Sequence, residues 1–506
     1  MRSIKFIITA LLFTLSLNAQ EEAYNLVFPT EEESLLNKGE GDAQYKNGIW
    51  VAYTSDSSYY QIGKFSNNQR NGIWRLYFDK KERARITYEN GSLEGKYILF
   101  YPDGEISVAA NFTNNQLEGL WQTYTERGRD NEKGYFASGE KTGEWVTYHP
   151  NREKAQIANY EKGVLNGAFK TFDSSGNLEL ETQYKNGLLN GLWTKYDFEE
   201  SPIEKGEFVN GLRNGHWVYS YEWSRKSADE YYNRGQKTGE WREYHFNGRL
   251  ASSITYEKDK PVGSSTTYHP NRRLESKTYY KLGLPDSVYT EYYANGIQSI
   301  EGTYKLGLKV GPWKYFHENG LISEFGIYET DLKSGNWKFF SESGQLRSEG
   351  KYEKDKETGQ WFNYYNNGKL ESIGSYRVGY KDGLWGYFHQ DGDLMKEETW
   401  SAGKLLAITP FVTSKGKSLS SGNLKNGNGD VTNFYPNGTR FSEGPYQNGL
   451  PNGEWKFYDE KGRLLTMGLL KDGVKEGQWK VYSTSRRVIK REFYENGLMV
   501  DESINN

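Results

Sequence analysis

Two kinds of short segment alternate along most of the chain. One alternates strictly between Leu346, Ser348, Gly350 and Tyr352 on one side and polar residues on the other. A period of two with polar partners is typical of a half-exposed β-strand. The other kind, as in Gly453–Tyr458, is dense in aromatic residues, a composition that also favours strands. Each pair of segments therefore predicts a β-hairpin.

The residues between these segments predict tight turns. Asn319-Gly320 and Asn367-Gly368 follow the aromatic segment, and pairs such as Asn186-Gly187 lead into the next repeat. Asn and Gly tolerate the positive φ that such turns need. A hairpin of about seven residues a strand is not stable alone in water, so we expect the hairpins to add edge to edge into one antiparallel sheet.

The hairpin pattern repeats with a step of 24 residues, measured from a Gly that stands two residues before a Trp or an equivalent residue. A period of 20 to 50 residues indicates a repeat array rather than a globular core. We predict an all-β, elongated array of antiparallel β-hairpins forming an open, twisted sheet. It has about nineteen repeats, of which those near Ser287 and Leu406 lack the anchor Gly. The anchors are Gly48, Gly72, Gly95, Gly119, Gly143, Gly167, Gly191, Gly215, Gly239, Gly263, Gly311, Gly335, Gly359, Gly383, Gly429, Gly453 and Gly477.

The aromatic residues have fixed places in the repeat. Thirteen of the fifteen Trp stand two residues after an anchor, and the residue five after the anchor is aromatic everywhere except at Ser220. The Gly of the second strand, such as Gly350, leaves a slot over which a neighbouring Trp ring can lie. The two aromatic positions have opposite parity, so either both faces of the sheet are aromatic or a bulge reorients one of them.

The ends of the chain differ from the repeats. Residues 1–19 carry two basic residues, a short apolar run and a small-residue end, which predicts a signal peptide and an exported protein of the periplasm, the cell envelope or the extracellular space. Residues 20–38 predict a flexible acidic leader. Repeats follow over residues 39–500, with degenerate stretches at 261–290 and 400–430, and residues 501–506 predict a disordered tail. We expect no transmembrane segment in the mature chain, because no apolar run of about 20 residues follows residue 19.

Charge and composition argue against several functions. The net charge of −3, with both signs interspersed, does not favour nucleic acid or anionic lipid as a partner. The chain has no Cys, and five of its six His are spread one to a repeat, so we expect no metal site. No carboxylate pair stands in an apolar context that would raise a pKa for acid catalysis. We therefore expect no enzymatic activity and no cofactor.

One stretch carries a family resemblance. Residues 184–193, with the Asn-Gly turns elsewhere, resemble the MORN-repeat variant of the bacterial YwqK-like antitoxin family. The likeness extends over roughly residues 39–500. It implies a MORN-like hairpin array that binds partners, and for some members a role as antitoxin or immunity protein.

These observations lead to one functional hypothesis and one alternative. We expect an exported scaffold that binds a protein, either an envelope protein or a toxin that it neutralises. Alternatively, exposed aromatic rows stack on an extended glycan of the cell envelope, although packing between repeats explains the same rows. The candidate partner-binding residues are Trp313, Trp337, Trp361, Trp385, Tyr364 and Phe388.

Overall fold

The computed structural model describes residues 36–39, 45–53, 58–221 and 225–504, and all regular elements in these ranges are β-strands. The chain divides into two compact parts, an N-terminal half (Met1–Gly248) and a C-terminal half (Arg249–Asn506). Each half consists of antiparallel hairpins, which confirms the predicted all-β repeat array. No helix among the described residues has the length and apolar character needed to cross a bilayer.

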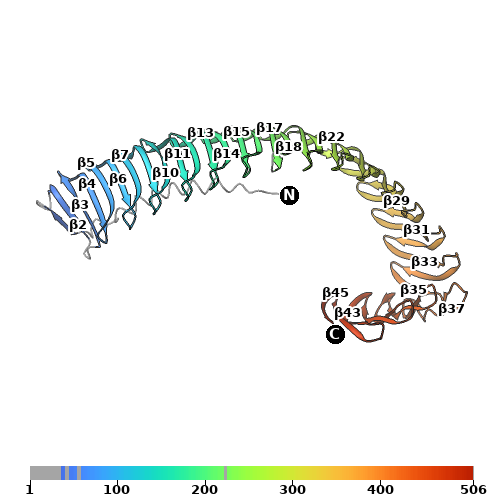
Figure 1. The fold of residues 1–506 in the computed structure, drawn as a ribbon. Helices are drawn as coiled ribbons and strands as arrows, with labels where there is room; N and C mark the ends of the chain where they lie inside the picture. Colours follow the sequence, from blue (N-terminus) through green and yellow to red (C-terminus); the bar gives the residue numbers. More distant parts are fainter. Residues whose placement is uncertain (1–35, 40–44, 54–57, 222–224, 505–506) are drawn as a thin grey trace. The chain divides into compact units, whose positions relative to one another are not determined.

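In the N-terminal half the long strands pair in the order of the sequence, as Figure 1 shows from β2 to β17, and the two-residue strands β8 and β19 pair only with the strand before them. The strands are β1 (Leu36–Gly39), β2 (Gly48–Tyr53), β3 (Tyr59–Ser66), β4 (Gln69–Phe78), β5 (Lys81–Glu89), β6 (Ser92–Phe100), β7 (Ile106–Thr113), β8 (Gln116–Leu117), β9 (Gly119–Tyr124), β10 (Asp130–Ala137), β11 (Glu140–Tyr148), β12 (Lys154–Glu161), β13 (Val164–Phe172), β14 (Leu178–Lys185), β15 (Leu188–Tyr196), β16 (Pro202–Val209), β17 (Leu212–Tyr221), β18 (Arg225–Asn233), β19 (Gln236–Lys237) and β20 (Gly239–Tyr244).

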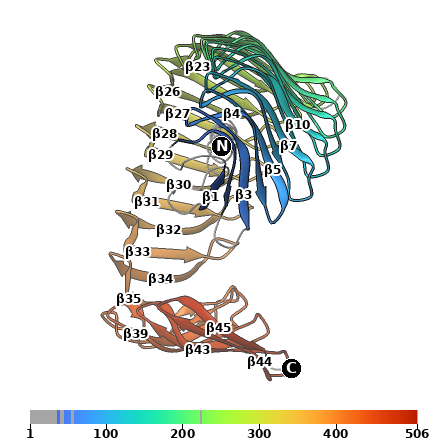
Figure 2. The same ribbon diagram turned by 90° about the vertical axis from the view of Figure 1, so that its left-hand side faces the viewer.

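The C-terminal half continues the same pattern, and Figure 2 shows β26 to β34 lying one beside the next. Its strands are β21 (Leu250–Glu257), β22 (Lys260–Tyr268), β23 (Leu274–Lys281), β24 (Leu284–Pro285), β25 (Ser287–Tyr292), β26 (Gln298–Lys305), β27 (Leu308–Phe316), β28 (Ile322–Glu329), β29 (Leu332–Phe340), β30 (Leu346–Glu353), β31 (Lys356–Tyr364), β32 (Leu370–Arg377), β33 (Tyr380–Phe388), β34 (Leu394–Ser401), β35 (Lys404–Ile408), β36 (Phe411–Val412), β37 (Ser418–Leu419), β38 (Gly429–Phe434), β39 (Arg440–Gln447), β40 (Leu450–Pro451), β41 (Gly453–Tyr458), β42 (Leu464–Lys471), β43 (Val474–Tyr482), β44 (Val488–Glu495) and β45 (Leu498–Ile504).

Two kinds of turn join the strands, and they lie at opposite edges of the sheet. Within a repeat the turn ends on a left-handed Gly. Gly320, with φ +88°, donates its N–H to the carbonyl of His317 at 2.9 Å. Between repeats the loop has two left-handed residues, as at Asn186 (φ 50°) and Gly187 (φ 79°), which is the type I′ geometry that suits the twist of a hairpin. We call the edge formed by these two-residue turns the I′ edge.

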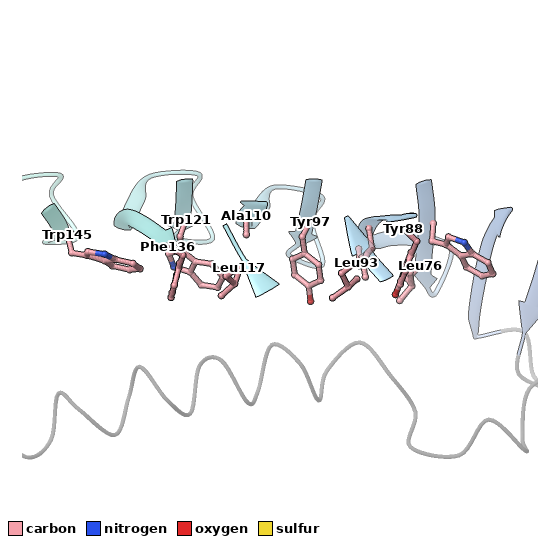
Figure 3. Close-up of a cluster of buried hydrophobic side chains, with 12 residues drawn as sticks. Leu76, Tyr88, Leu93, Tyr97, Ala110, Leu117, Trp121, Phe136 and Trp145 are labelled. Carbon is pink, nitrogen blue, oxygen red and sulfur yellow. The ribbon is translucent and has the colours of Figure 1, made fainter. Parts of the chain in front are cut away.

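The core is a row of rings on one face of the sheet rather than an interior between layers. Figure 3 shows Tyr88, Tyr97, Trp121, Phe136 and Trp145 on one side of successive strands of the N-terminal half. In the C-terminal half Trp313, Tyr328 and Trp337 form an equivalent buried cluster. We call this face of the sheet the tryptophan face. It buries the apolar surface that each hairpin alone would expose.

The structure refines the predicted boundaries. Strand pairing already includes Leu36–Gly39, so part of the predicted leader is extended along β2. β45 continues to Ile504 and pairs with β44, although a disordered tail is predicted from residue 501. Lys490 forms an ion pair with Glu502 there, one contact that extends the strand. The predicted signal peptide and the rest of the leader lie outside the described residues.

The two stretches predicted to be degenerate behave differently. Residues 261–290 form the regular strands β22 to β25, although Ser287 stands in the place of the anchor Gly. Residues 400–430 do break the pattern. β35 ends at Ile408, β36 and β37 form a small separate hairpin, and β38 begins a second sheet at Gly429.

Candidate functional site

In the regular repeats a bulge at the anchor Gly places the Trp two residues later. Phe325 of β28 pairs with Lys338 of β29, and Ile327 pairs with Ser334, so Gly326 alone faces three residues of β29. Gly335 in this bulge has φ +66°, a conformation that favours Gly. The bulge thereby turns the Trp ring back over the preceding strand.

Trp337 shows how completely the ring is enclosed. A Cβ added to Gly326 would lie 2.2 Å from the Trp337 ring, so the indole occupies the space of the missing side chain. Tyr328 and Tyr352 meet the ring edge-on at centroid distances of 5.2 and 6.1 Å. The indole N–H donates to the carbonyl of Ile327 at 3.2 Å. The side chain is 0% exposed, and its one polar group, the indole N–H, is hydrogen-bonded within the array.

A basic residue covers the remaining ring surface. The Nζ of Lys333 lies 3.9 Å from the centroid of Trp337 and 3.3 Å from the Glu324 carboxylate. Arg213 covers Trp217 in the same way, at 4.4 Å, and pairs with Glu204. A cation over an indole face gains electrostatic energy from the ring quadrupole. The tryptophan face is therefore closed by charged side chains.

The four Trp predicted to bind a partner are part of this enclosed row. Trp313, Trp337, Trp361 and Trp385 are between 0 and 6% exposed. The slot predicted for the second-strand Gly is confirmed at nine places, each with the Trp eleven residues after the Gly. The pairs are Gly63–Trp74, Gly134–Trp145, Gly206–Trp217, Gly302–Trp313, Gly326–Trp337, Gly350–Trp361, Gly374–Trp385, Gly444–Trp455 and Gly468–Trp479. These Trp rings hold neighbouring hairpins together and present no face to a ligand.

Tyr364 lies on the opposite face, and Phe388 is the equivalent residue one repeat on. The hydroxyl of Tyr364 donates to Glu349 at 3.0 Å, and Glu349 pairs with Lys338 at 3.0 Å. Because Lys338 is adjacent to Trp337 along β29, its side chain points to the other face. Both faces thus carry aromatic residues, although a bulge also falls just before Tyr364 and Phe388. Both side chains are half-buried.

The ion pairs on this second face account for its shifted pKa values. The hydrogen bond from Lys338 to Glu349 lowers the pKa of that carboxyl group. Burial, followed by the bond to Glu349, raises the pKa of Tyr364 to about 12. Among the described residues, every carboxyl group with a resolved pKa shift is shifted downward. They are Asp173, Asp229, Glu349, Glu398, Asp459 and Glu492. A general acid would need the opposite shift.

Four of the six histidines fasten the turns within each half. The Nε2 of His149 lies 2.8 Å from the carbonyl of Phe172, and that of His317 lies 3.1 Å from the carbonyl of Phe340, one repeat further on. His269 and His389 make the equivalent contacts. No group of three or more potential metal ligands occurs among the described residues.

One buried charged cluster stands at the break in the pattern. Glu398, opposite Trp385, receives hydrogen bonds from Lys396 at 2.7 Å, Tyr387 at 2.8 Å and the indole of Trp400 at 3.0 Å. These partners outweigh the effect of burial and lower the pKa of Glu398. The cluster is fully paired and positions the end of the regular sheet.

Several large exposed apolar side chains lie at the I′ edge, which the predicted site residues did not include. In the C-terminal half Leu282 and Leu306 occupy the first position of two successive turns. The signal in the sequence is the repeated Lys-Leu-Gly-Leu at residues 281–284 and 305–308, where the turns at residues 186–187 and 210–211 have Asn-Gly.

Comparison with known proteins identifies the repeat type. Five segments match the family model described as "MORN repeat variant", at residues 165–186, 237–258, 333–354, 357–377 and 428–448. The segment at 333–354 spans the hairpin of β29 and β30, so the family unit coincides with one hairpin of the structure. No curated protein matches the chain.

Matching solved structures include the Tc holotoxin pore of Photorhabdus luminescens carrying the TccC3-D651A mutation, with 10% identity over 88% of this chain and 29% of that chain. The TcdB2-TccC3 complex matches with 11% identity over 88% of this chain and 31% of that chain. The TM-scores are 0.13 and 0.12, too low to support an argument. The chain spans about a third of the length of these proteins. The family matches support the interpretation of the chain as a MORN-repeat protein.

Proposed function

We propose that the protein is an exported, non-enzymatic repeat scaffold that binds a protein partner. The supporting observation is that one repeated hairpin builds both halves and that its Trp residues pack between neighbouring hairpins. What remains exposed is the turns at both edges and the charged side chains of the face opposite the tryptophan face. Large, regularly spaced surfaces of this kind suit the binding of an extended partner.

The absence of enzymatic activity is part of this proposal. Three kinds of observation support it: the downward pKa shifts of the carboxyl groups, the complete pairing of the buried Glu398 and the turn-fastening role of four of the histidines. A hydrolytic or transfer activity of the purified protein that is lost on a single carboxylate or Ser substitution would contradict it.

Toxin neutralisation in the periplasm or outside the cell is one form of this function. The resemblance to antitoxins and the signal-like residues 1–19 motivate it. Export can be tested by fusing residues 1–30 to an alkaline phosphatase that folds only after secretion. We expect phosphatase activity, and an inactive fusion retained inside the cell would contradict export.

The glycan alternative loses its main support, because the Trp rings on which it depends are buried. A sedimentation assay with peptidoglycan and insoluble polysaccharides tests the choice directly. We expect the protein to stay in the supernatant. Saturable retention by these polymers would favour the glycan-binding module.

The direct test of the scaffold function is reconstitution. The purified mature chain is mixed with individually purified exported proteins, including any secreted toxin encoded beside it. We expect a stoichiometric complex with at least one of them by calorimetry and size-exclusion chromatography. The absence of any complex would contradict the proposal.

A further inference from the structure

The hairpin of β4 and β5 carries a concentration of basic side chains. Between residues 75 and 85 five residues are basic and two are acidic, whereas the whole chain has a net charge of −3. The five are Arg75, Lys80, Lys81, Arg83 and Arg85, and we call them the basic cluster. Lys80 lies in the turn and Lys81 begins β5, and both are exposed. The local charge is therefore opposite in sign to that of the protein.

Two of these arginines stand directly opposite each other. Arg75 of β4 is the cross-strand partner of Arg85 in β5. Their neighbours Trp74 and Ala84 belong to the buried core, so both guanidinium groups point to the face opposite the tryptophan face. The two side chains are 50% and 39% exposed. Like charges directly opposite each other destabilise a sheet, so this pair lowers the stability of the hairpin unless an anion lies beside it.

The carboxylates of the hairpin do not neutralise the basic cluster. Glu82 accepts hydrogen bonds from Arg85 at 3.0 and 2.8 Å, whereas the Nε of Arg75 is 3.7 Å away, beyond hydrogen-bond reach. The Nε of Arg83 is buried and has no hydrogen-bond partner among the described residues. Among the ion pairs between described residues, Glu82 supplies the only carboxylate to the cluster. Arg75 and Arg83 therefore keep donors that the fold does not use.

The neighbouring strands add to the positive charge. β3 to β6 lie side by side (Figure 1), and residues 59–100 include eight basic and four acidic residues. The hairpin of β43 and β44 has a similar cross-strand pair, Lys480 and Arg491. Residues 464–504 around it are nearly balanced, however, with seven basic and six acidic residues. The surplus of positive charge is thus larger on β3 to β6.

A carboxylate fits the donors that remain. A guanidinium group binds a carboxylate through two parallel N–H donors, and hydrogen bonds between charged groups are stronger than neutral ones. Resting on the proposed scaffold function, we propose that the basic cluster binds a short acidic segment of the partner protein. The Asp or Glu side chains of this segment accept hydrogen bonds from Arg75 and Arg83. Their negative charge also separates the positive charges of Arg75 and Arg85 and speeds the encounter of the two proteins.

The test uses an acidic peptide as the probe. A fluorescently labelled peptide of alternating Glu and Ser is titrated with the full mature chain, and binding is followed by anisotropy. The variant Arg75→Gln/Arg83→Gln, which keeps the hydrogen bonds of Glu82, should bind about tenfold more weakly. The control Lys480→Gln/Arg491→Gln removes the same charge from the hairpin of β43 and β44 and should bind like the parent. An equal loss in both variants would show non-specific attraction and would overturn the proposal.

The chemistry of the contact is tested by two further changes. A peptide with Gln in place of Glu should not bind, and binding of this peptide would overturn the proposal. The variant Arg75→Lys/Arg83→Lys keeps the charge but loses the parallel donors, so its affinity should lie between those of the parent and the Gln variant. Failure of the parent chain to bind the acidic peptide would also overturn the proposal.

Hydrogen exchange of the β4–β5 segment distinguishes a binding role from a folding role. Because Arg75→Gln/Arg83→Gln relieves the repulsion between Arg75 and Arg85, exchange should be as slow as in the parent or slower. Faster exchange would show that the two arginines serve the fold, and would overturn the proposal.

Other occupants give different results. The chain itself contains an acidic run, Glu31–Glu33. If replacing these three residues by Gln in the full mature chain tightens peptide binding about tenfold, this run is the occupant and the proposal is wrong. Unchanged affinity supports a segment of the partner. Binding to phosphatidylglycerol vesicles that is lost in Arg75→Gln/Arg83→Gln would replace the acidic segment by a membrane surface.

The outcome for the basic cluster can be separated from the outcome for the scaffold function. If a reconstituted native partner binds the parent and Arg75→Gln/Arg83→Gln equally, the scaffold function stands and the proposal for the basic cluster is wrong. If the acidic peptide binds but no native partner does, the scaffold function fails and the cluster loses its protein partner.

Discussion

The regular hairpins from β26 to β33 and the break that begins at β34 solve the same packing problem differently. In the regular part a Gly such as Gly374 lies under the Trp of the next repeat, Trp385. At the break Glu398 stands in the Gly position, and the residue eleven later is Thr409 rather than Trp. The Gly and the Trp are thus lost together.

The break remains well packed in spite of this loss. Hydrogen bonds from Lys396, Tyr387 and Trp400 hold Glu398, and an apolar cluster of Leu405, Leu424 and Val431 fills the space beyond it. The comparison teaches that the second-strand position and the residue eleven later act as one unit. At this break the small residue and the large ring over it are replaced together.

Other repeats support this interpretation. Ala158 precedes Phe169, and Ile254 precedes Ser265, so a larger second-strand residue goes with a smaller partner. Thr182 precedes Trp193 and Glu230 precedes Trp241, so the Trp is kept over a larger residue in these two repeats, and both of these Trp are only half-buried. The two side chains that the bulge brings together therefore fill one common space, and a larger one at the first position leaves less room for the second.

The largest expected effect comes from filling one slot of the regular part. Gly326→Ile places a side chain where the Trp337 ring now lies. We expect a loss of about 3 kcal/mol or more in the local free energy of opening, at the upper end for overpacking of a core. Hydrogen exchange of the β28–β29 segment measures it, because a long array does not unfold in two states. Parent-like exchange in Gly326→Ile would contradict the assigned packing.

At the break, removing the charge of Glu398 should have the next largest effect. Glu398→Gln leaves Lys396 without its carboxylate partner, and breaking a buried ion pair costs about 3 kcal/mol. The folded-state pKa of Glu398 is lowered, so its contribution is present above the unfolded pKa of 4.5 and is lost as the pH falls below it. We expect the acid sensitivity of β34–β35 hydrogen exchange to decrease in Glu398→Gln. Unchanged acid sensitivity would show that Glu398 does not stabilise this end of the sheet.

A smaller, pH-dependent effect concerns Tyr352, which meets Trp337 and Trp361 edge-on. Burial raises its pKa from 10.0 to about 12. A raised folded-state pKa contributes stability that is complete below pH 10 and is lost as the pH rises to 12. Tyr352→Phe should therefore reduce the loss of stability over this range. The urea concentration at the midpoint of denaturation, measured at each pH, tests this. An identical alkaline profile would show that Tyr352 already titrates normally.

Much of this array could be predicted from the sequence, because the Gly, Trp and Asn-Gly positions recur in register. The face of Tyr364 and Phe388 could not, since a bulge lies between them and the anchor and parity alone does not settle it. The candidate Trp residues could be identified, but their enclosure depends on Lys333, Tyr328 and Tyr352, which come from neighbouring strands. The left-handed Leu282 is visible only once its turn type is known.

The smallest effect concerns the basic cover of the Trp rings. Glu357 occupies the position that Lys333 holds one repeat earlier, and Trp361 is the most exposed of the four candidate Trp. Glu357→Lys should place a cation over Trp361 and stabilise β31 by about 0.5 kcal/mol. Lys333→Glu is the matched reverse change. We expect slower hydrogen exchange in Glu357→Lys and faster hydrogen exchange in Lys333→Glu than in the parent. The opposite order would contradict a stabilising cover.

The most direct test of the account is a double-mutant cycle that copies the native pair Ile254–Ser265 into the regular part. Hydrogen exchange of the β28–β29 segment is compared among the parent, Gly326→Ile, Trp337→Ser and the double variant. If the two positions act as one unit, the double variant should be more stable than Gly326→Ile alone, with a coupling of at least about 1 kcal/mol. Additive losses, with no recovery in the double variant, would contradict the account.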